Sequence, residues 1–358
     1  MGINFQADCR PVLIGSLPLK DHLQAVRWVF DYTPEIPLWV QLPANKEEGM
    51  MRQFLPGLPG LTVTDDKVFI DSGAEGFDRD ILRFYEEYMA VTEGRQSLSD
   101  SRFVLTPDTA PGFSAFIDHV DRTGVQPLAV KGQITGPITF CTGVNDQNGR
   151  AIFYDAQLRD AAVKLLALKA QWQVQQLSRF KRPVIIFFDE PALAGFGSSE
   201  FISITPEEIQ NCFKEVFSAV HSQGGLAGVH VCANTDWSLV LESAVDIVNF
   251  DAYAYFDRFM LYPDQIRSYL ESGRILAWGI VPTLNSEDIE RETTDRLLTG
   301  WEERLKKIEA LGIERKKVLR QSLITPSCGA GSLSLEFARK VLKLTSEISA
   351  CLNSGLSP

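Results

Sequence analysis

His230 and Cys232 are the two residues whose types and spacing point most directly to chemistry. They follow the short apolar run at residues 226–229, which comes after Gly224-Gly225 and is typical of a buried strand. Residues two apart in a strand point to the same face, so the imidazole and the thiol are expected side by side. A mixed nitrogen and sulfur pair suits zinc. The same spacing also fits a core histidine beside a buried cysteine, and the pair alone does not decide between the two.

The elements that must position this pair alternate along the chain. Short apolar runs are followed by longer helical patterns, which is typical of a parallel α/β fold. Eight strands are predicted, at residues 12–17, 37–42, 128–132, 184–188, 225–231, 246–251, 275–280 and 318–324. Helical patterns are predicted at residues 21–32 and 151–180, and from Thr205, Asn285 and Ser332. Because eight strands close a (β/α)8 barrel, we predict that residues 1–358 form a single TIM barrel of the α/β class.

One interval is too long for a single crossover between neighbouring strands. It separates the second and third predicted strands, and we interpret residues 43 to about 125 as an insertion that covers the barrel mouth. Within it, residues 61–70 are typical of a hairpin around Asp65-Asp66, and residues 80–92 and 112–121 have helical patterns.

Composition narrows the possible partners and the compartment. The net charge of −11 argues against nucleic acid and against anionic membranes as partners. Hydrophobic content of 45% and charged content of 23% are typical of a soluble globular protein, and no apolar run is long enough to span a bilayer. The first ten residues show no signal-peptide pattern, and six scattered cysteines form no disulfide framework. We therefore expect a cytoplasmic protein with free thiols available for metal binding.

Further potential ligands fall at other predicted strand ends. In a closed barrel, the carboxyl ends of the strands and the loops after them meet at one rim, where catalytic residues lie. Asp251 ends the sixth predicted strand, and Cys328 follows the eighth. With His230 and Cys232 they offer one nitrogen, two sulfurs and one carboxylate, a set that zinc accepts in tetrahedral coordination. We therefore predict a zinc site formed by these four residues.

Polar groups after other strands are candidates for holding a substrate. Asp189 ends the fourth strand, and we favour a role in binding a polar substrate group over the alternatives that it caps the next helix or pairs inside the barrel. After the first strand, the backbone N–H groups of Ile14, Gly15 and Ser16 could hold a carboxylate. The loop at residues 133–137 could close on a ligand.

Several of these motifs, in order along the chain, resemble the catalytic half of cobalamin-independent methionine synthase. That family shares a wider superfamily with uroporphyrinogen decarboxylase and the methylcobalamin:thiol methyltransferases. The resemblance covers most of the chain and is carried by Ile14-Gly15-Ser16, Thr135-Gly136-Pro137, residues 189–193 (Asp-Glu-Pro-Ala-Leu), His230 and Cys232, and Cys328-Gly329.

The resemblance implies a (β/α)8 barrel that binds zinc and methylates the thiol of homocysteine. Its zinc ligands fall on His230, Cys232, Asp251 and Cys328, where Asp251 replaces a glutamate of the synthase. The loop that holds the amino-acid end of homocysteine falls on Ile14, Gly15 and Ser16. The aspartate that binds the substrate amino group falls on Asp189, and a second acid for this group falls on Glu75 in the insertion.

Two departures from the family bear on the methyl donor. This chain has a single predicted barrel, whereas the full synthase has an additional barrel before the catalytic one. The family's proton-donating histidine after the seventh strand has no counterpart in residues 279–285, and the folate-contacting tryptophan has none either. Methyltetrahydrofolate needs its departing nitrogen protonated, whereas a methylcorrinoid does not. The resemblance therefore implies a short methionine synthase, or a related thiol methyltransferase, that receives its methyl group from a methylated corrinoid protein.

Two other functions stay open at this point. One is a metal-free decarboxylase of the uroporphyrinogen type, a family with paired arginines near the amino terminus, where this chain has Arg10 alone. The other is a non-catalytic barrel that contains a structural zinc and binds a corrinoid protein. A closed four-ligand site would favour that barrel, because a catalytic zinc keeps one position for substrate.

Overall fold

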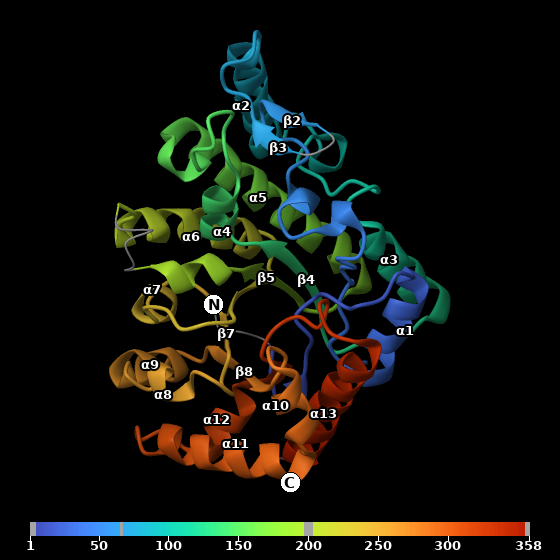
Figure 1. Ribbon diagram of the computed structural model, residues 1–358, viewed down its shortest axis with the longest axis vertical. Helices are drawn as coiled ribbons and strands as arrows, with labels where there is room; N and C mark the ends of the chain where they lie inside the picture. Colours follow the sequence, from blue (N-terminus) through green and yellow to red (C-terminus); the bar gives the residue numbers. More distant parts are fainter. Residues whose placement is uncertain (1–4, 65–66, 197–202, 355–358) are drawn as a thin grey trace.

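The computed structural model describes residues 5–64, 67–196 and 203–354. Parallel strands form its main sheet: β1 (Arg10–Pro11), β4 (Val130–Thr135), β5 (Val184–Asp189), β6 (Leu226–Val231), β7 (Ile247–Phe250), β8 (Ile275–Val281) and β9 (Ser322–Pro326). Their spatial order is β1-β9-β8-β7-β6-β5-β4, and helices surround the sheet (Figure 1). The prediction of an α/β, TIM-barrel-like fold is therefore confirmed.

The second predicted strand, residues 37–42, lies between the two edges of this sheet. Leu38 forms a parallel bridge with Lys131 of β4, and Gln41 forms another with Ser16, which follows β1. Its backbone pairing consists of isolated bridges, so it is extended chain rather than a continuous strand. It nevertheless connects both edges of the sheet, as the second strand of a barrel does.

Several helices begin at a residue whose side chain caps the first turn. Asp21 accepts a hydrogen bond from the N–H of Gln24, and Thr205 and Glu208 form a capping box. The helices are α1 (His22–Tyr32), α2 (Phe77–Thr92), α3 (Pro111–Thr123), α4 (Pro137–Gly143), α5 (Ala156–Leu177), α6 (Pro206–His221), α7 (Ser238–Leu241), α8 (Phe256–Phe259), α9 (Pro263–Glu271), α10 (Ser286–Arg291), α11 (Thr294–Glu309), α12 (Arg315–Arg320) and α13 (Leu335–Ser354). Short 3-10 helices are η1 (Lys46–Glu48), η2 (Arg52–Phe54), η3 (Leu98–Asp100), η4 (Ile152–Tyr154), η5 (Ser178–Phe180) and η6 (Pro191–Gly195).

The predicted hairpin is present as β2 (Leu61–Val63) and β3 (Val68–Ile70), which pair antiparallel. Its expected turn at Asp65-Asp66 lies outside the described residues. The hairpin and α2 project from one end of the molecule, whereas α3 lies beside α1 (Figure 1). Phe30 of α1 stacks on Phe116 of α3, so α3 packs as a helix of the outer layer.

The predicted eighth strand begins too early. Val318 and Leu319 belong to α12, and the strand starts at Ser322. Both side chains are buried, because they form the apolar face of a short helix whose other residues are mostly basic. The predicted start of the strand is wrong because it includes the apolar residues Val318 and Leu319 of the preceding helix. The strand itself is present.

Alternation along the strands divides the side chains between two layers. In β5, Ile185 and Phe187 belong to the small core inside the sheet, whereas Ile186 and Phe188 belong to the large core under the helices. Asp189 continues the inward-facing series. The same alternation directs His230 of β6 and Asn249 of β7 inward, which brings polar side chains together near the carboxyl ends of the strands. None of the helices in the described part of the chain combines the length and the apolarity that a membrane span requires.

Candidate metal centre

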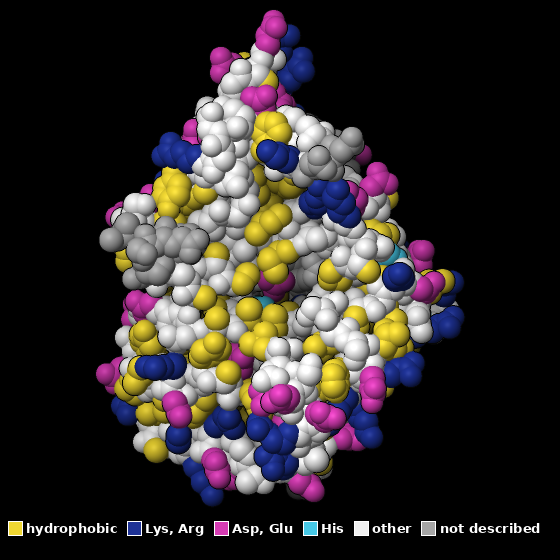
Figure 2. All heavy atoms as spheres, viewed as in Figure 1, with side chains coloured by type: hydrophobic (Ala, Val, Ile, Leu, Met, Phe, Trp, Pro, Cys, Tyr) yellow, Lys and Arg dark blue, Asp and Glu magenta, His cyan; other side chains and the backbone are white. Residues whose placement is uncertain are grey.

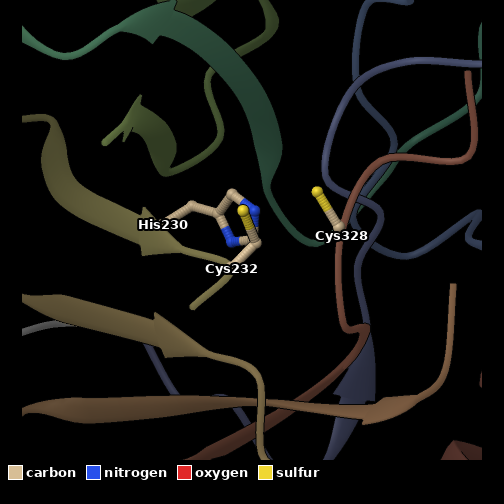
Figure 3. A group of neighbouring side chains, drawn as sticks. All are labelled: His230, Cys232 and Cys328. Atoms are coloured by element: carbon tan, nitrogen blue, oxygen red, sulfur yellow. The ribbon is translucent and has the colours of Figure 1, made fainter. Parts of the chain in front are cut away.

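Three of the four predicted metal ligands meet at one point. His230 lies near the end of β6, Cys232 follows that strand directly, and Cys328 lies in the loop after β9. One potential ligand atom from each lies within 4.8 Å of the other two. Figure 3 shows the imidazole and both thiols gathered from these two segments, which are far apart in the sequence. Because parallel strands of a barrel bring their carboxyl ends to the same rim, β6 and β9 supply a nitrogen and two sulfurs in one place although β7 and β8 lie between them.

The hydrogen bonds of Asn249 determine which ring nitrogen of His230 is available. The Asn249 amide group donates to the Ala277 carbonyl and to Thr325 Oγ1, both at 2.8 Å, so its oxygen remains as an acceptor. His230 Nδ1 bonds to that oxygen and must therefore carry the proton. Nε2 is then an unprotonated acceptor, and it is buried without a hydrogen-bond partner. A buried lone pair beside two thiols fits a metal ligand of the type found in zinc sites.

The two thiols have opposite acid–base properties. A hydrogen bond that Cys328 donates, together with interactions with His230, lowers the pKa of Cys232 to about 4 despite its burial. The same interaction and burial raise the pKa of Cys328. Deprotonation is therefore favoured at Cys232 over Cys328, and the thiolate is the form that binds metals. The donor set of imidazole, thiolate and a second thiol suits zinc.

Asp251 lies near this group but is not part of it. Its Oδ1 accepts a hydrogen bond of 2.8 Å from the N–H of Ala254, and the residue is buried. Burial raises the pKa of the Asp251 carboxyl to about 6. The group of mutually close ligand atoms contains His230, Cys232 and Cys328 only. Ligation by Asp251 therefore stays a prediction, whereas the other three residues are brought together.

Asp189 is a buried carboxylate that faces the same region. It pairs in register with His230 across β5 and β6, and its Oδ1 is buried without a hydrogen-bond partner. Burial raises the pKa of Asp189 to about 6, while the neighbouring His230 and Lys131 oppose that rise. An unpartnered buried carboxylate oxygen costs free energy unless a ligand satisfies it, which supports a binding role for this group.

Glu190 has a structural role instead. Its carboxylate accepts hydrogen bonds from the N–H groups of Ile138 and Thr139, at 2.9 and 2.8 Å, and from Thr139 Oγ1 at 2.7 Å. A Cβ atom added at Gly136 would lie 2.2 Å from the Glu190 carboxyl carbon, so only glycine fits there. Glu190 thus fastens the loop after β4 to the end of β5, beside Asp189.

Glu190 also predicts a pH dependence of stability. Burial raises the pKa of its carboxyl from 4.5 to about 7, so the folded chain retains a proton that the unfolded chain releases. The free energy of unfolding should therefore fall as pH rises from about 4.5 to about 7, with Glu190 accounting for about 3 kcal/mol. Denaturation of zinc-free protein across this range should show a shallower fall in Glu190→Gln. The control Glu86→Gln, at an exposed position on α2, should keep the full slope. An equally steep fall of the free energy of unfolding in Glu190→Gln and Glu86→Gln would contradict the assignment of this pH dependence to Glu190.

A cavity of about 650 Å³ opens over the three potential ligands. Figure 2 shows hydrophobic side chains gathered around the hollowed centre of this face. The cavity is lined by Ile14, Ser16, Pro18, Lys20, Gln41, Pro43, Ala44, Glu48, Met50, Asp189, Pro191, His230, Cys232, Cys328, Gly329, Gly331 and Ser332. Predicted substrate-binding residues from β5 and from the loop after β1 thus share one space with the metal ligands.

Glu75 does not line this cavity. It lies in an exposed turn before α2, and its predicted contact with substrate remains untested. Another acid of the same segment, Glu48, is almost completely buried at the cavity wall. Its carboxylate accepts hydrogen bonds from the Leu42 N–H and the Asn45 amide, and Oε1 lies 2.9 Å from Nε2 of His22. Nothing in the sequence distinguishes Glu48 from other acids of the segment, because its position depends on how this segment folds back.

Lys131 and Asn249 were not singled out from the sequence, although both occupy inward-facing positions of predicted strands. Lys131 is fully buried in β4, where its ammonium group donates to the Ile14 carbonyl and to Gln133 Oε1. It therefore holds the loop at residues 14–16 in place. Both Lys131 and Asn249 could have been identified from the sequence, because each places a charged or amide side chain inside an otherwise apolar strand.

Asn249 should control metal affinity without contacting the metal. Replacing it with leucine removes the acceptor that fixes His230 Nδ1, so the ring can rotate or change tautomer. Zinc affinity of Asn249→Leu, measured by chelator competition, should fall about tenfold to a hundredfold. The control Asn353→Leu removes an amide that donates to the Asp8 carbonyl, and zinc affinity should not change. Unchanged affinity in Asn249→Leu would show that the Asn249–His230 bond does not support the metal site.

Comparisons with known proteins show the fold only. A methyltransferase from Methanosarcina mazei has 10% sequence identity and a TM-score of 0.53, and the match covers 97% of this chain and 95% of that one. A B12-independent methionine synthase from Shewanella sp. W3-18-1, in complex with selenomethionine, has 18% identity and a TM-score of 0.48 over 67% of each chain. A GH5-4 endoglucanase from Ruminococcus champanellensis has 13% identity and a TM-score of 0.36, with 68% of this chain and 76% of that chain covered.

These likenesses have low sequence identity. No family model matches the sequence, and no curated protein matches it either. The structure of the Methanosarcina mazei methyltransferase, which matches nearly the whole chain, therefore supports the overall fold alone. What this chain does must be argued from its own site.

Proposed function

We propose that this chain is a zinc-dependent methyltransferase that transfers a methyl group to the thiol of homocysteine or a related small thiol. The observation that carries the proposal is the group of His230, Cys232 and Cys328 at the base of a large cavity. Three protein donors leave a fourth position of tetrahedral zinc for substrate, as catalytic zinc sites do. If Asp251 completes the set in the resting state, it is the ligand that a substrate sulfur would replace.

The metal and the protein would have separate tasks. Zinc bound to His230, Cys232 and Cys328 would keep a coordinated substrate thiol ionised at neutral pH, where a free thiol with a pKa of about 8.5 is mostly protonated. Asp189 would bind the amino group of the substrate through its unpartnered oxygen. The loop at residues 14–16 would hold the carboxylate of the same molecule.

The cavity is larger than a small amino acid requires. Its volume of about 650 Å³ lies within the range of pockets that enclose drug-sized ligands, and Pro18, Pro43 and Met50 form part of its wall. None of the other histidines, His22, His119 and His221, lines it. A donor that needs no proton on its leaving group, such as a methylated corrinoid protein, fits this environment better than methyltetrahydrofolate does.

The proposed transfer is a single displacement. The thiolate sulfur attacks the methyl carbon of the methylcorrinoid and a sulfur–carbon bond forms. The cobalt–carbon bond breaks with its electron pair remaining on cobalt, which leaves the reduced corrinoid.

A donor comparison tests this proposal. Zinc-loaded protein with homocysteine and methylcobalamin, as a protein-free corrinoid, should form methionine and reduced cobalamin, detected by mass spectrometry and by absorbance. Methyltetrahydrofolate in its place should give no methionine above the protein-free blank. Methionine from the folate alone would overturn the choice of donor, and no methionine from either donor would overturn the proposed activity.

The two other functions have less support. Arg10, which stands alone near the amino terminus, donates hydrogen bonds to Asp8, Glu35 and the Gln6 carbonyl, and it does not line the cavity. Of the described lysines and arginines, Lys20 alone lies on the cavity wall, whereas the uroporphyrinogen decarboxylase family has paired arginines. A non-catalytic barrel with a structural zinc would need a closed four-ligand set. The donor group found among the described residues has three members and opens to the cavity.

A further inference from the structure

The loop that carries Cys328 rests on Ser16, which belongs to a distant part of the chain. Ser16 Oγ accepts a hydrogen bond of 3.2 Å from the N–H of Gly331. The Ser16 carbonyl accepts another, of 3.0 Å, from the N–H of Ala330. One residue of the segment after β1 therefore binds two consecutive peptide groups that lie just beyond a metal ligand.

The contact is close enough to require glycine in the Cys328 loop. A Cβ atom added at Gly329 would lie 2.3 Å from Ser16 Oγ, well inside the van der Waals distance. The next nearest atom would be Ser16 Cβ, at an acceptable 3.5 Å. The hydroxyl oxygen of Ser16 is therefore the only atom within 4 Å that excludes a side chain at Gly329.

Both ends of this arrangement are anchored. On the Ser16 side, the Gly15 carbonyl accepts from the Gln41 N–H at 3.0 Å, and the Leu17 N–H donates to the Gln41 carbonyl at 3.1 Å. On the other side, the N–H of Ser327 donates to the Val281 carbonyl at 2.8 Å, and Ser327 Oγ lies 2.9 Å from Thr283 Oγ1. Cys328 is thus held between Ser327, which is fixed on β8, and the loop that rests on Ser16.

We infer that Ser16 is a positioning residue for the metal centre: its hydroxyl and carbonyl hold the Cys328 loop so that the sulfur lies within reach of His230 and Cys232. This role is separate from the proposed contact of Ser16 with a substrate carboxylate. The positioning role rests on the proposed metal site, because it concerns how the ligand Cys328 is placed. Removing a group that orients a metal ligand loosens the position of that ligand.

Zinc affinity without substrate measures this role directly. In chelator competition, Ser16→Ala should bind zinc about tenfold to a hundredfold more weakly than the unmodified chain, the range seen when a group that orients a metal ligand is lost. In cobalt(II)-substituted protein, the thiolate-to-cobalt absorption band should fall toward half, because one of two thiolates is lost while Cys232 remains. A structural defect elsewhere would not change this band.

A double-mutant cycle tests whether the Ser16 contact itself is responsible. Gly329→Ala alone should weaken zinc binding, because the added methyl group meets Ser16 Oγ. In the Ser16→Ala background the obstructing oxygen is absent, so the same substitution should add little further loss. The control Ser243→Ala removes a buried serine hydroxyl that accepts the Val245 N–H away from the metal centre, and zinc affinity should not change.

The outcomes separate the two proposals. Strict additivity of Ser16→Ala and Gly329→Ala, or full zinc affinity and an unchanged cobalt band in Ser16→Ala, would overturn the positioning role while the metal site stands. Failure of the unmodified chain to bind zinc would overturn the proposed function, and the inference about Ser16 with it. The melting temperature of each variant shows whether it folds. If Gly329→Ala or the double variant fails to fold, the cobalt band of Ser16→Ala alone tests the positioning role.

Discussion

Cys232→Ser and Cys328→Ser should each remove most of the bound zinc and abolish thiol methylation. Each variant loses one of the three donors that lie within 4.8 Å of one another, and a serine hydroxyl is a poor replacement for a thiolate on zinc. We expect zinc affinity to fall by more than about a hundredfold, beyond the effect of losing a group that only orients a ligand. Zinc content, measured after dialysis, tests the expected loss of metal. Methionine formation tests the expected loss of thiol methylation.

Cys351→Ser is the matched control for these variants. Cys351 is an exposed free cysteine on α13 and does not line the cavity, so its loss should change neither zinc content nor activity. Full zinc content and full turnover in Cys232→Ser and Cys328→Ser would end the assignment of a zinc-thiolate site. Loss of zinc with full turnover would instead show that the metal is structural.

Asp189→Asn should weaken homocysteine binding while leaving the zinc content unchanged. The carboxylate has one buried oxygen without a partner at the cavity wall, and the proposed partner is the ammonium group of the substrate. Hydrogen bonds to charged groups contribute about 1.5–3 kcal/mol, so the Kd for homocysteine should rise about tenfold to a hundredfold. Calorimetric titration of zinc-loaded protein measures this change.

The comparison ligand for this test is 4-mercaptobutyrate, which is homocysteine without its amino group. Its affinity for the unmodified chain should already be low, and Asp189→Asn should change it little. Equal loss of affinity for both thiols would show that Asp189 supports the metal centre through His230 rather than binding the amino group. Unchanged homocysteine affinity would remove Asp189 from the substrate site.

Much of this fold follows from local sequence patterns. Period-two alternation in β5 and β6 predicts that Asp189 and His230 face inward, and the barrel rule then brings their strand ends together. Capping residues such as Thr205 predict where helices begin. The convergence of His230, Cys232 and Cys328 could be predicted because each lies at or just after a buried strand.

What could not be predicted depends on contacts between distant segments. Residues 37–42 have the composition of a strand, but only two bridges form, because the neighbouring segments meet them at single points. Glu48, rather than Glu75, lines the cavity because η1 reaches the cavity wall, whereas the turn before α2 does not. The hydrogen bond that fixes His230 is accepted by the oxygen of Asn249. This contact becomes visible only when β6 and β7 are paired.

Metal analysis combined with zinc-edge X-ray absorption, with and without homocysteine, tests the central claim most directly. We predict about one zinc per chain, bound by nitrogen and two sulfurs, and one additional sulfur neighbour once homocysteine is present. Absence of zinc after purification and reconstitution, or a metal shell that homocysteine leaves unchanged, would contradict it.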